Sequence, residues 1–415
     1  MVLLSIATAG LAAFLAFAIE PLVGRLLLPT YGGAAAVWTT ALVFFQGALL
    51  LGYATAHVLI RVLGVRRAAF VEVGVVGVAL LALPVALPAA AAPPAGTEPA
   101  IWLLGVLALT VGAPFVALAT ATPTLQQWTA AAGDAQARGG AFRLFGASNL
   151  GSLAGLLAYP VLIEPNIDLD AQARLWTFGY FAFVAAIGTG AVVLARRTPG
   201  RDERRPADGP RSSGRVRLGW IGLAAIPAGL VVGTTAQLTI DVAVVPLLWV
   251  GPLAIYLLTF VLAFGGPRPI GLRWADLLLP PLALGLVLTL FAGLSVPLWL
   301  TFTVALGSLG CAGLVCHGRL ALGRPIPERL TEYDLAIAAG GALGGLLTGI
   351  VAPLVLPIPI EGALALALAL AVRRGSRSPD ASEPTEGGGG SRPIGRRSMS
   401  ALARTPFLLR YAVAA

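Results

Sequence analysis

The sequence predicts an all-helical membrane protein with about twelve transmembrane helices in two six-helix halves. It is 57% hydrophobic and 11% charged, whereas soluble domains are about 25% charged. Its apolar runs are continuous over about 20 residues, the length of helix that crosses a hydrocarbon core of about 30 Å. Strands of a membrane barrel instead alternate over roughly ten residues. Composition and run length therefore favour helices that face lipid.

The apolar runs place the spans along the chain. The first run begins at Val2 and ends before Glu20-Pro21. It has no basic segment before it and no small-residue cleavage site after it, so it is predicted to be a span and not a signal peptide. The last run is the shortest. In chain order the predicted spans are 2–19, 36–60, 68–88, 101–121, 143–163, 174–195, 218–236, 246–264, 274–292, 297–316, 334–354 and 357–372.

Arginine gathers in alternate loops. All 28 basic residues are arginine, and loops after even-numbered spans hold clusters such as Arg66-Arg67 and those within 196–217. Loops after odd-numbered spans contain only Arg25 and Arg174. Under the positive-inside rule, the N terminus, the even loops and the C terminus are cytoplasmic, as in an inner-membrane protein. Arginines in loops do not form a groove-binding stripe, so the predicted partner is the lipid bilayer and no nucleic acid.

A long hydrophilic loop divides the spans six and six. It occupies 197–217 and separates a first half, 1–196, from a second half, 218–372. Because six is even, both halves enter the membrane with the same orientation, as parallel repeats do. The polar tail, 373–415, contains the run Gly387–Gly390 and is predicted to be a disordered cytoplasmic segment.

Two sequence motifs recur six spans apart and support this division. The turn around Gly64 recurs around Gly271, with arginines at both ends of each motif. Spans 5 and 11 share a glycine pair followed by a proline, which predicts equivalent positions that allow close helix contact or mark a central cavity. Ala79 in span 3 is predicted to face lipid. The glycine motifs are Gly151, Gly155 and Pro160 in span 5, and Gly341, Gly345 and Pro353 in span 11.

Polar groups inside the spans are candidate functional residues because their burial in lipid is costly. Glu20 and Arg25 bracket the first outer loop, as a structural clamp or as the lining of a vestibule. His57, in the inner third of span 2, faces headgroups or a cavity. Asn149 in span 5 is placed to bond a neighbouring helix. The residues predicted for a central cavity or for packing are Glu20, Arg25, His57, Arg143, Asn149, Gly151, Gly155, Asp241, His317, Gly341 and Gly345.

The residues that could bind a metal do not form a metal motif. Cys316 and His317 are adjacent and point apart on a helix, and no fourth ligand lies nearby in sequence. Cys311 and Cys316 share one apolar run, which gives no sign of a disulfide framework. Asp241 belongs to the polar outer end of span 7, as a solvated cap or as part of an outward-facing site. No cofactor, metal site or catalytic residue is predicted.

Several segments match one known family in residues and in order, among them Glu20–Arg25, Pro29–Gly33, Arg143–Gly151, Pro246–Trp249, Cys316–Gly318 and Gly340–Gly345. They resemble the membrane portion of the bacterial fused major-facilitator/spermidine-synthase-like family. The resemblance covers most of residues 1–355 and implies a membrane fold. Members of that family typically carry a soluble aminopropyltransferase-like domain, which needs a Gly-rich loop after a strand to hold an S-adenosyl ligand. The run Gly387–Gly390 follows no strand pattern, so the enzymatic activity is not expected here.

The expected role is therefore a transporter-like or scaffold module of the inner membrane, with an unknown substrate. One alternative is a membrane anchor or subunit for a separately encoded aminopropyltransferase-like protein in polyamine metabolism. Another is a fragment of a longer fusion.

Overall fold

A computed structural model describes residues 1–33, 35–133, 137–198, 212–241, 248–266, 268–292, 296–326, 329–356 and 360–374. Across these ranges the regular structure is helical and contains no strand. The α-helices are α1 (Val2–Tyr31), α2 (Ala35–Val78), α3 (Pro99–Leu107), α4 (Ala113–Ala131), α5 (Ala137–Ala158), α6 (Leu169–Arg197), α7 (Gly214–Asp241), α8 (Val250–Phe264), α9 (Leu272–Ala292), α10 (Leu298–Leu322), α11 (Leu330–Leu346), α12 (Ala352–Val355) and α13 (Glu361–Arg374).

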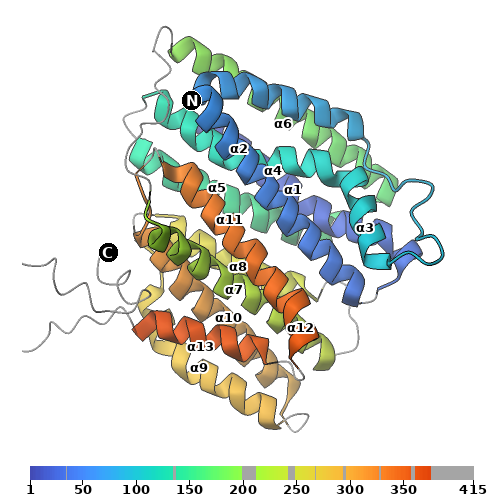
Figure 1. The fold of residues 1–415 in the computed structure, drawn as a ribbon, viewed down its shortest axis with the longest axis vertical. Coiled ribbons are helices and arrows are strands. Elements are labelled where there is room, and N and C mark those ends of the chain that lie inside the picture. The colour runs from blue at the N-terminus through green and yellow to red at the C-terminus, as the bar shows by residue number, and fades with distance from the viewer. Residues whose placement is uncertain are drawn as a thin grey trace, which may run out of the picture.

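The helices cross the bundle in turn, as hydropathy predicts. Nine helical stretches in the described ranges are long and apolar enough to span a membrane. One of them, Ala36–Ala82, turns back at Gly64 and so makes two passes. With the shorter helices α8 and α13, the described residues make twelve passes. Figure 1 shows α1 to α6 in the upper part of the bundle and α7 to α13 in the lower part.

Short π-helical segments continue three of the passes. Ala108–Gly112 joins α3 to α4, Tyr159–Ile163 follows α5, and Leu347–Val351 joins α11 to α12. The last two lie at the same point of passes 5 and 11, close to the repeated prolines. Proline removes a backbone donor and crowds the preceding turn, which explains the local change of helical pitch.

Glycine makes the two tight turns that the repeated motifs predict. Gly64 has φ 75° and Gly271 has φ 78°. A side chain is strained in this left-handed region, whereas glycine adopts it freely. The two turns therefore share one backbone conformation, six passes apart.

The predicted end of the first span is wrong. α1 continues through Pro21 and Pro29 and ends only at Tyr31. Proline is tolerated in membrane helices because neighbouring groups satisfy the freed carbonyl. Glu20 and Arg25, expected on either side of an outer loop, therefore both belong to one continuous helix.

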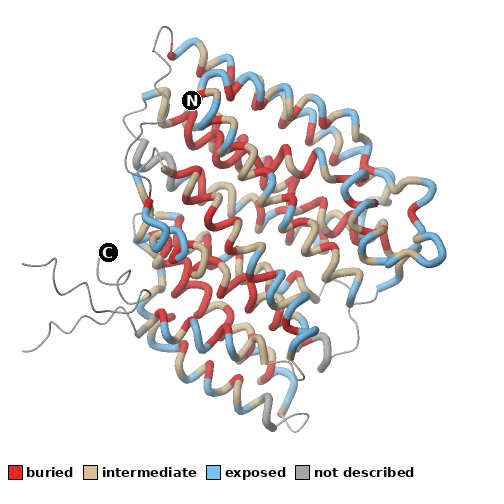
Figure 2. The backbone as a smooth tube through the Cα atoms, in the orientation of Figure 1, coloured by how far each residue is buried: buried red, intermediate tan, exposed pale blue. Residues whose placement is uncertain are grey.

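Two large hydrophobic clusters and a small third one, which consists of Leu156, Val250 and Leu257, form the core of the described residues. One large cluster consists of buried residues between Ala9 and Leu194, and the other, apart from Phe145, of buried residues between Trp220 and Val372. Figure 2 shows buried residues, in red, along the helices of both groups. Inside the groups α1 packs on α5 and α7 packs on α11, while α5–α8 and α2–α11 join one group to the other. The pair α5–α8 joins passes 5 and 8, and the pair α2–α11 joins passes 2 and 11. Pass 5 corresponds to pass 11, and pass 8 to pass 2, so the two pairs are equivalent in the repeat.

Glycines allow the helices within each half to approach closely. A Cβ added at Gly155 would meet the carbonyl oxygen of Phe14 in α1, and one at Gly151 would meet that of Gly10. In the second half, a Cβ at Gly344 would meet the carbonyl oxygen of Ala225 in α7. The backbones of both helix pairs are therefore in direct contact.

Of the two roles predicted for Gly341 and Gly345, close helix contact and a central cavity, the contact with α7 falls to the preceding residues instead. Gly340 and Gly344 pack against α7, one residue before the predicted positions, and a helix turns by about 100° per residue. Gly341 consequently has nothing within 4 Å of its Cβ position, while Gly345 faces the Gln46 side chain of α2. Ala79, predicted to face lipid, is only 3% exposed.

The topology leads to a direct test with fused reporters. Paired reporters, one active in the cytoplasm and one active outside, are expected to show alternating sides because each loop follows one more pass. A single inverted reporter in the middle of the chain would contradict the pass count. Cytoplasmic signals are expected after Arg67, Arg205, Arg324 and Arg377, and outside signals near Pro94 and Asp168.

Candidate functional site

A cavity of about 180 Å³ lies where the two groups of helices meet. Residues of α1, α2, α4, α5, α7, α8 and α11 line it, so both halves contribute to its wall. Most of this wall is apolar. Its hydrogen-bonding groups are Glu20, Gln46, Tyr53, Thr122, Ser148, Asn149, Ser152, Tyr256 and Asp334. Its aromatic rings also include Phe17, Phe45, Phe115, Phe145 and Phe260.

The ionisable side chains of aspartate, glutamate, arginine, lysine or histidine type on the described cavity wall are all acidic. Glu20 comes from α1 and Asp334 from α11, and no arginine, lysine or histidine belongs to the lining. Asp334 is fully buried, and neither carboxylate oxygen has a hydrogen-bond partner among the described residues. The side-chain oxygen of Gln46 is likewise buried without a partner there. The wall thus presents acceptors that lack donors.

The first half contributes a small polar cluster to the same wall. The hydroxyl oxygens of Thr122 in α4 and Ser148 in α5 lie 2.9 Å apart. Asn149 donates from its side-chain nitrogen to the Phe145 carbonyl oxygen at 2.8 Å, within its own helix. The predicted bond from Asn149 to a neighbouring helix is therefore not the contact observed.

Beyond the cavity, towards the predicted cytoplasmic side, several side chains join the halves. His57 Nδ1 lies 3.0 Å from the Thr331 hydroxyl oxygen, which links α2 to α11. Arg324, just after α10, donates to the side-chain oxygen of Gln126 in α4 at 3.5 Å. Its guanidinium carbon also lies 5.6 Å from the ring centre of Phe145 in α5. His57 thus belongs to an inter-half contact and not to the cavity wall.

Arg324 and Asp334 are the cation and the acid that interact at this end of the cavity. Burial lowers the pKa of Arg324, and the Asp334 carboxylate opposes that shift by stabilising the charged guanidinium. Neither residue belongs to the site predicted from the sequence. Asp334 stands at the inner end of predicted span 11, where an acid ordinarily faces headgroups.

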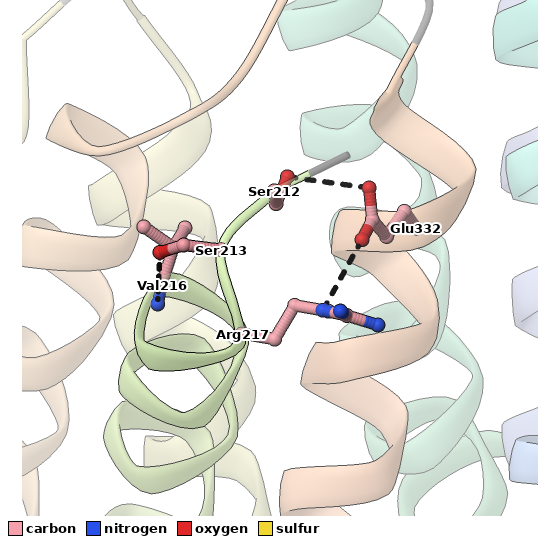
Figure 3. Close-up of polar contacts among 5 residues, drawn as sticks. All are labelled: Ser212, Ser213, Val216, Arg217 and Glu332. Carbon is pink, nitrogen blue, oxygen red and sulfur yellow. Dashed lines mark hydrogen bonds and ion pairs between the residues drawn. The ribbon is translucent and has the colours of Figure 1, made fainter. Parts of the chain in front are cut away.

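A second polar contact fixes the start of α11 to the start of α7 (Figure 3). Glu332 Oε1 lies 3.5 Å from Nε of Arg217. Ser212 Oγ donates to the other Glu332 oxygen at 3.2 Å. Both partners precede or begin the second half, so Glu332 ties the entry of that half to the helix that carries Asp334.

Other predicted residues lie away from the cavity. Arg25 pairs with Glu164 after α5, at 3.0 Å between Nε and Oε1, and not with Glu20. Arg143 is exposed at the start of α5. Asp241 is the last residue of α7, and its side chain lies outside the described part. Of the predicted residues whose side chains the structure describes, Glu20, Asn149 and Gly341 line the cavity and the others lie outside its wall.

His317 is buried behind the cavity wall in α10. Its Nδ1 lies 2.8 Å from the Thr259 hydroxyl oxygen, and its ring stacks on Phe260 with 3.6 Å between centroids. Within the described residues, no three histidine, cysteine or acidic side chains gather at a possible metal site. His317 therefore supports the wall through Phe260.

Comparison with known proteins identifies the fold. No protein-family model and no curated protein matches this sequence. Among solved structures, the inward-open xylose transporter XylE of E. coli has a TM-score of 0.54 and 13% identity, over 90% of this chain and 95% of that chain. XylE, described as a major facilitator superfamily proton:xylose symporter, bound to 6-bromo-6-deoxy-D-glucose gives 0.55 and 12%, over 90% and 94%.

A partially occluded inward-open form of XylE gives a TM-score of 0.54 and 13% identity, over 92% of this chain and 99% of that chain. These likenesses concern the fold, and the resemblance to spermidine-synthase fusions stays a prediction. The predicted fold class is confirmed: this is an all-α, multi-pass membrane protein with the twelve-helix fold of major facilitator transporters.

Proposed function

We propose that the chain carries a small solute across the cell inner membrane by exposing its central cavity to each side in turn. The observation that supports this most directly is the cavity itself, which both halves line and which holds two acids. Polar groups within a membrane are costly to bury, so a passive scaffold has no use for this arrangement. The arginine pattern supports the choice of membrane.

The contacts between the halves suit such a movement. Besides the packing of α5 on α8 and of α2 and α4 on α11, the halves are joined by single hydrogen bonds at one end, including His57 with Thr331 and Arg324 with Gln126. These single hydrogen bonds are weak enough to break when the halves rock against each other. A scaffold for a separately encoded aminopropyltransferase remains a prediction from the resemblance alone.

The proposed movement can be tested without knowing the solute. Cys311 and Cys316 are first replaced by serine and alanine, and single cysteines are then introduced as Ser148→Cys or Ser152→Cys on the cavity wall. A membrane-impermeant maleimide is applied to right-side-out and to inside-out vesicles. Both cavity cysteines are expected to react from both sides, because the cavity opens alternately.

A matched control uses Gly105→Cys, at an exposed position of α3 with nothing within 4 Å of its Cβ. That cysteine faces lipid and is expected to react from neither side. Labelling of Ser148→Cys and Ser152→Cys from only one side, or from neither, would overturn the proposed transport function.

A further inference from the structure

We infer that the solute is a small protonated amine with a compact apolar body. The inference rests on the proposed transport function and names the class of molecule that the same cavity takes.

The first support is the charge of the cavity wall. Glu20 has no ion pair or hydrogen bond within the described residues, while the nearby cation of its own helix, Arg25, is paired with Glu164. Arg324 acts electrostatically on Asp334 but does not belong to the lining. Two acids thus face one interacting cation, so one carboxyl of the wall has no cation of the protein to pair with when it is ionised. Uncompensated charge in a membrane is strongly unfavourable.

The second support is the hydrogen-bonding character of the partnerless groups. On the cavity wall the buried side-chain atoms without partners are both oxygens of Asp334 and the side-chain oxygen of Gln46. All three are acceptors in the described structure. A protonated primary amine brings three N–H donors and no acceptor, whereas a carboxylate or a sulfate brings acceptors only. An amine can therefore donate hydrogen bonds to such atoms, and an anion cannot.

The third support is the shape and apolar character of the space. The cavity measures about 180 Å³, and an apolar cavity of roughly 150 Å³ in another protein holds benzene. Rings such as Tyr53, Tyr256 and Phe260 line it. Aromatic faces attract cations and also accept apolar groups. A single ring or a similar hydrocarbon body joined to an amino group fits these dimensions.

A series of probes tests the inference. Three of them share a phenyl group on a two-carbon chain and differ in charge, which is positive, zero or negative. The purified full chain in lipid nanodiscs is titrated with 2-phenylethylamine, 2-phenylethanol and phenylacetate, and with D-xylose as an uncharged polar solute. The amine is expected to raise the unfolding temperature and to bind at least about tenfold more tightly than the alcohol, the equivalent of one charge-assisted hydrogen bond. Phenylacetate and D-xylose are expected to produce no shift.

Two isosteric variants test the acids. Glu20→Gln and Asp334→Asn each keep side-chain size and remove one negative charge, so each is expected to weaken amine binding by about tenfold or more. Glu98→Gln, at an exposed acid outside the cavity, is the matched control and is expected to bind the amine as the parent does.

The outcomes separate this inference from the transport proposal. Absence of amine binding, equal binding of 2-phenylethanol, or tighter binding of phenylacetate overturns the amine class, whatever the variants do. If the cavity cysteines still react from both sides, transport stands and only the solute class falls. If they react from one side only, the transport proposal falls regardless of which probe binds.

Discussion

Replacing Gly155 with leucine is expected to lower the unfolding temperature in detergent strongly. A Cβ at this position would meet the carbonyl oxygen of Phe14 and lie 3.1 Å from its Cα. These are backbone atoms, which cannot rotate away as a side chain can, so α1 and α5 must separate. Overpacking usually costs ~1–3 kcal/mol, and a contact between two backbones belongs at the upper end. Gly344→Leu is expected to have the same effect between α11 and α7.

One control for this prediction comes from the same helix, α5, and the other is the same residue type, glycine. Ala154→Leu adds a leucine one position away on the exposed face of α5, and Gly105→Leu adds one at an exposed glycine. Leucine is compatible with lipid, so both variants are expected to melt close to the parent. If Gly155→Leu and Gly344→Leu also melt like the parent, the close packing of α1–α5 and α7–α11 is refuted.

Replacing Arg324 with glutamine is expected to produce the second large loss of stability. Arg324 interacts with the fully buried Asp334 carboxylate and also lies over the rings of Phe145 and Phe264. Removing it leaves a buried negative charge without its cation. Breaking a buried pair in this way costs about 3–5 kcal/mol, and the partial exposure of Arg324 places the expected loss near the lower limit.

A double variant isolates the electrostatic part of this effect. Adding Asp334→Asn to Arg324→Gln removes the stranded charge and is expected to restore part of the lost stability, measured by SDS titration as a double-mutant cycle. Arg268→Gln, at an exposed arginine, is the control, with an expected change within about 0.5 kcal/mol. If the double variant is no more stable than Arg324→Gln alone, the two residues are not coupled.

The passes of the chain are predictable because lipid imposes them. A membrane helix must satisfy its own backbone and present apolar side chains, so hydropathy and arginine placement reveal it directly. The turns at Gly64 and Gly271 are equally local and follow from their motifs. The position at which α1 ends does not follow from the nearby sequence. Pro21 predicts a break, and only the packed helices around it show that α1 continues to Tyr31.

The cavity was harder to predict because it depends on helix rotation. A shift of one residue separates the glycines that contact α7, Gly340 and Gly344, from Gly341, which lines the cavity as one of its two predicted roles. Asp334 is not predicted because it stands at the inner end of span 11, where an acid ordinarily faces headgroups. A usable signal exists: Asp334, Ala338 and Gly341 recur at helical spacing on one face of α11. A stripe of small residues that contains an acid is therefore a better indicator of a cavity-lining helix face than the position of a residue in the middle of a span.

The contact of Glu332 in Figure 3 has a mechanical meaning for the site. Glu332 and Asp334 are separated by about 3 Å along the axis of α11, and a helix transmits displacement stiffly over that length. Ser212 lies within the 197–217 linker between the halves, and it bonds to Glu332. Tension on the linker therefore reaches the acid of the cavity through one hydrogen bond and half a turn of helix.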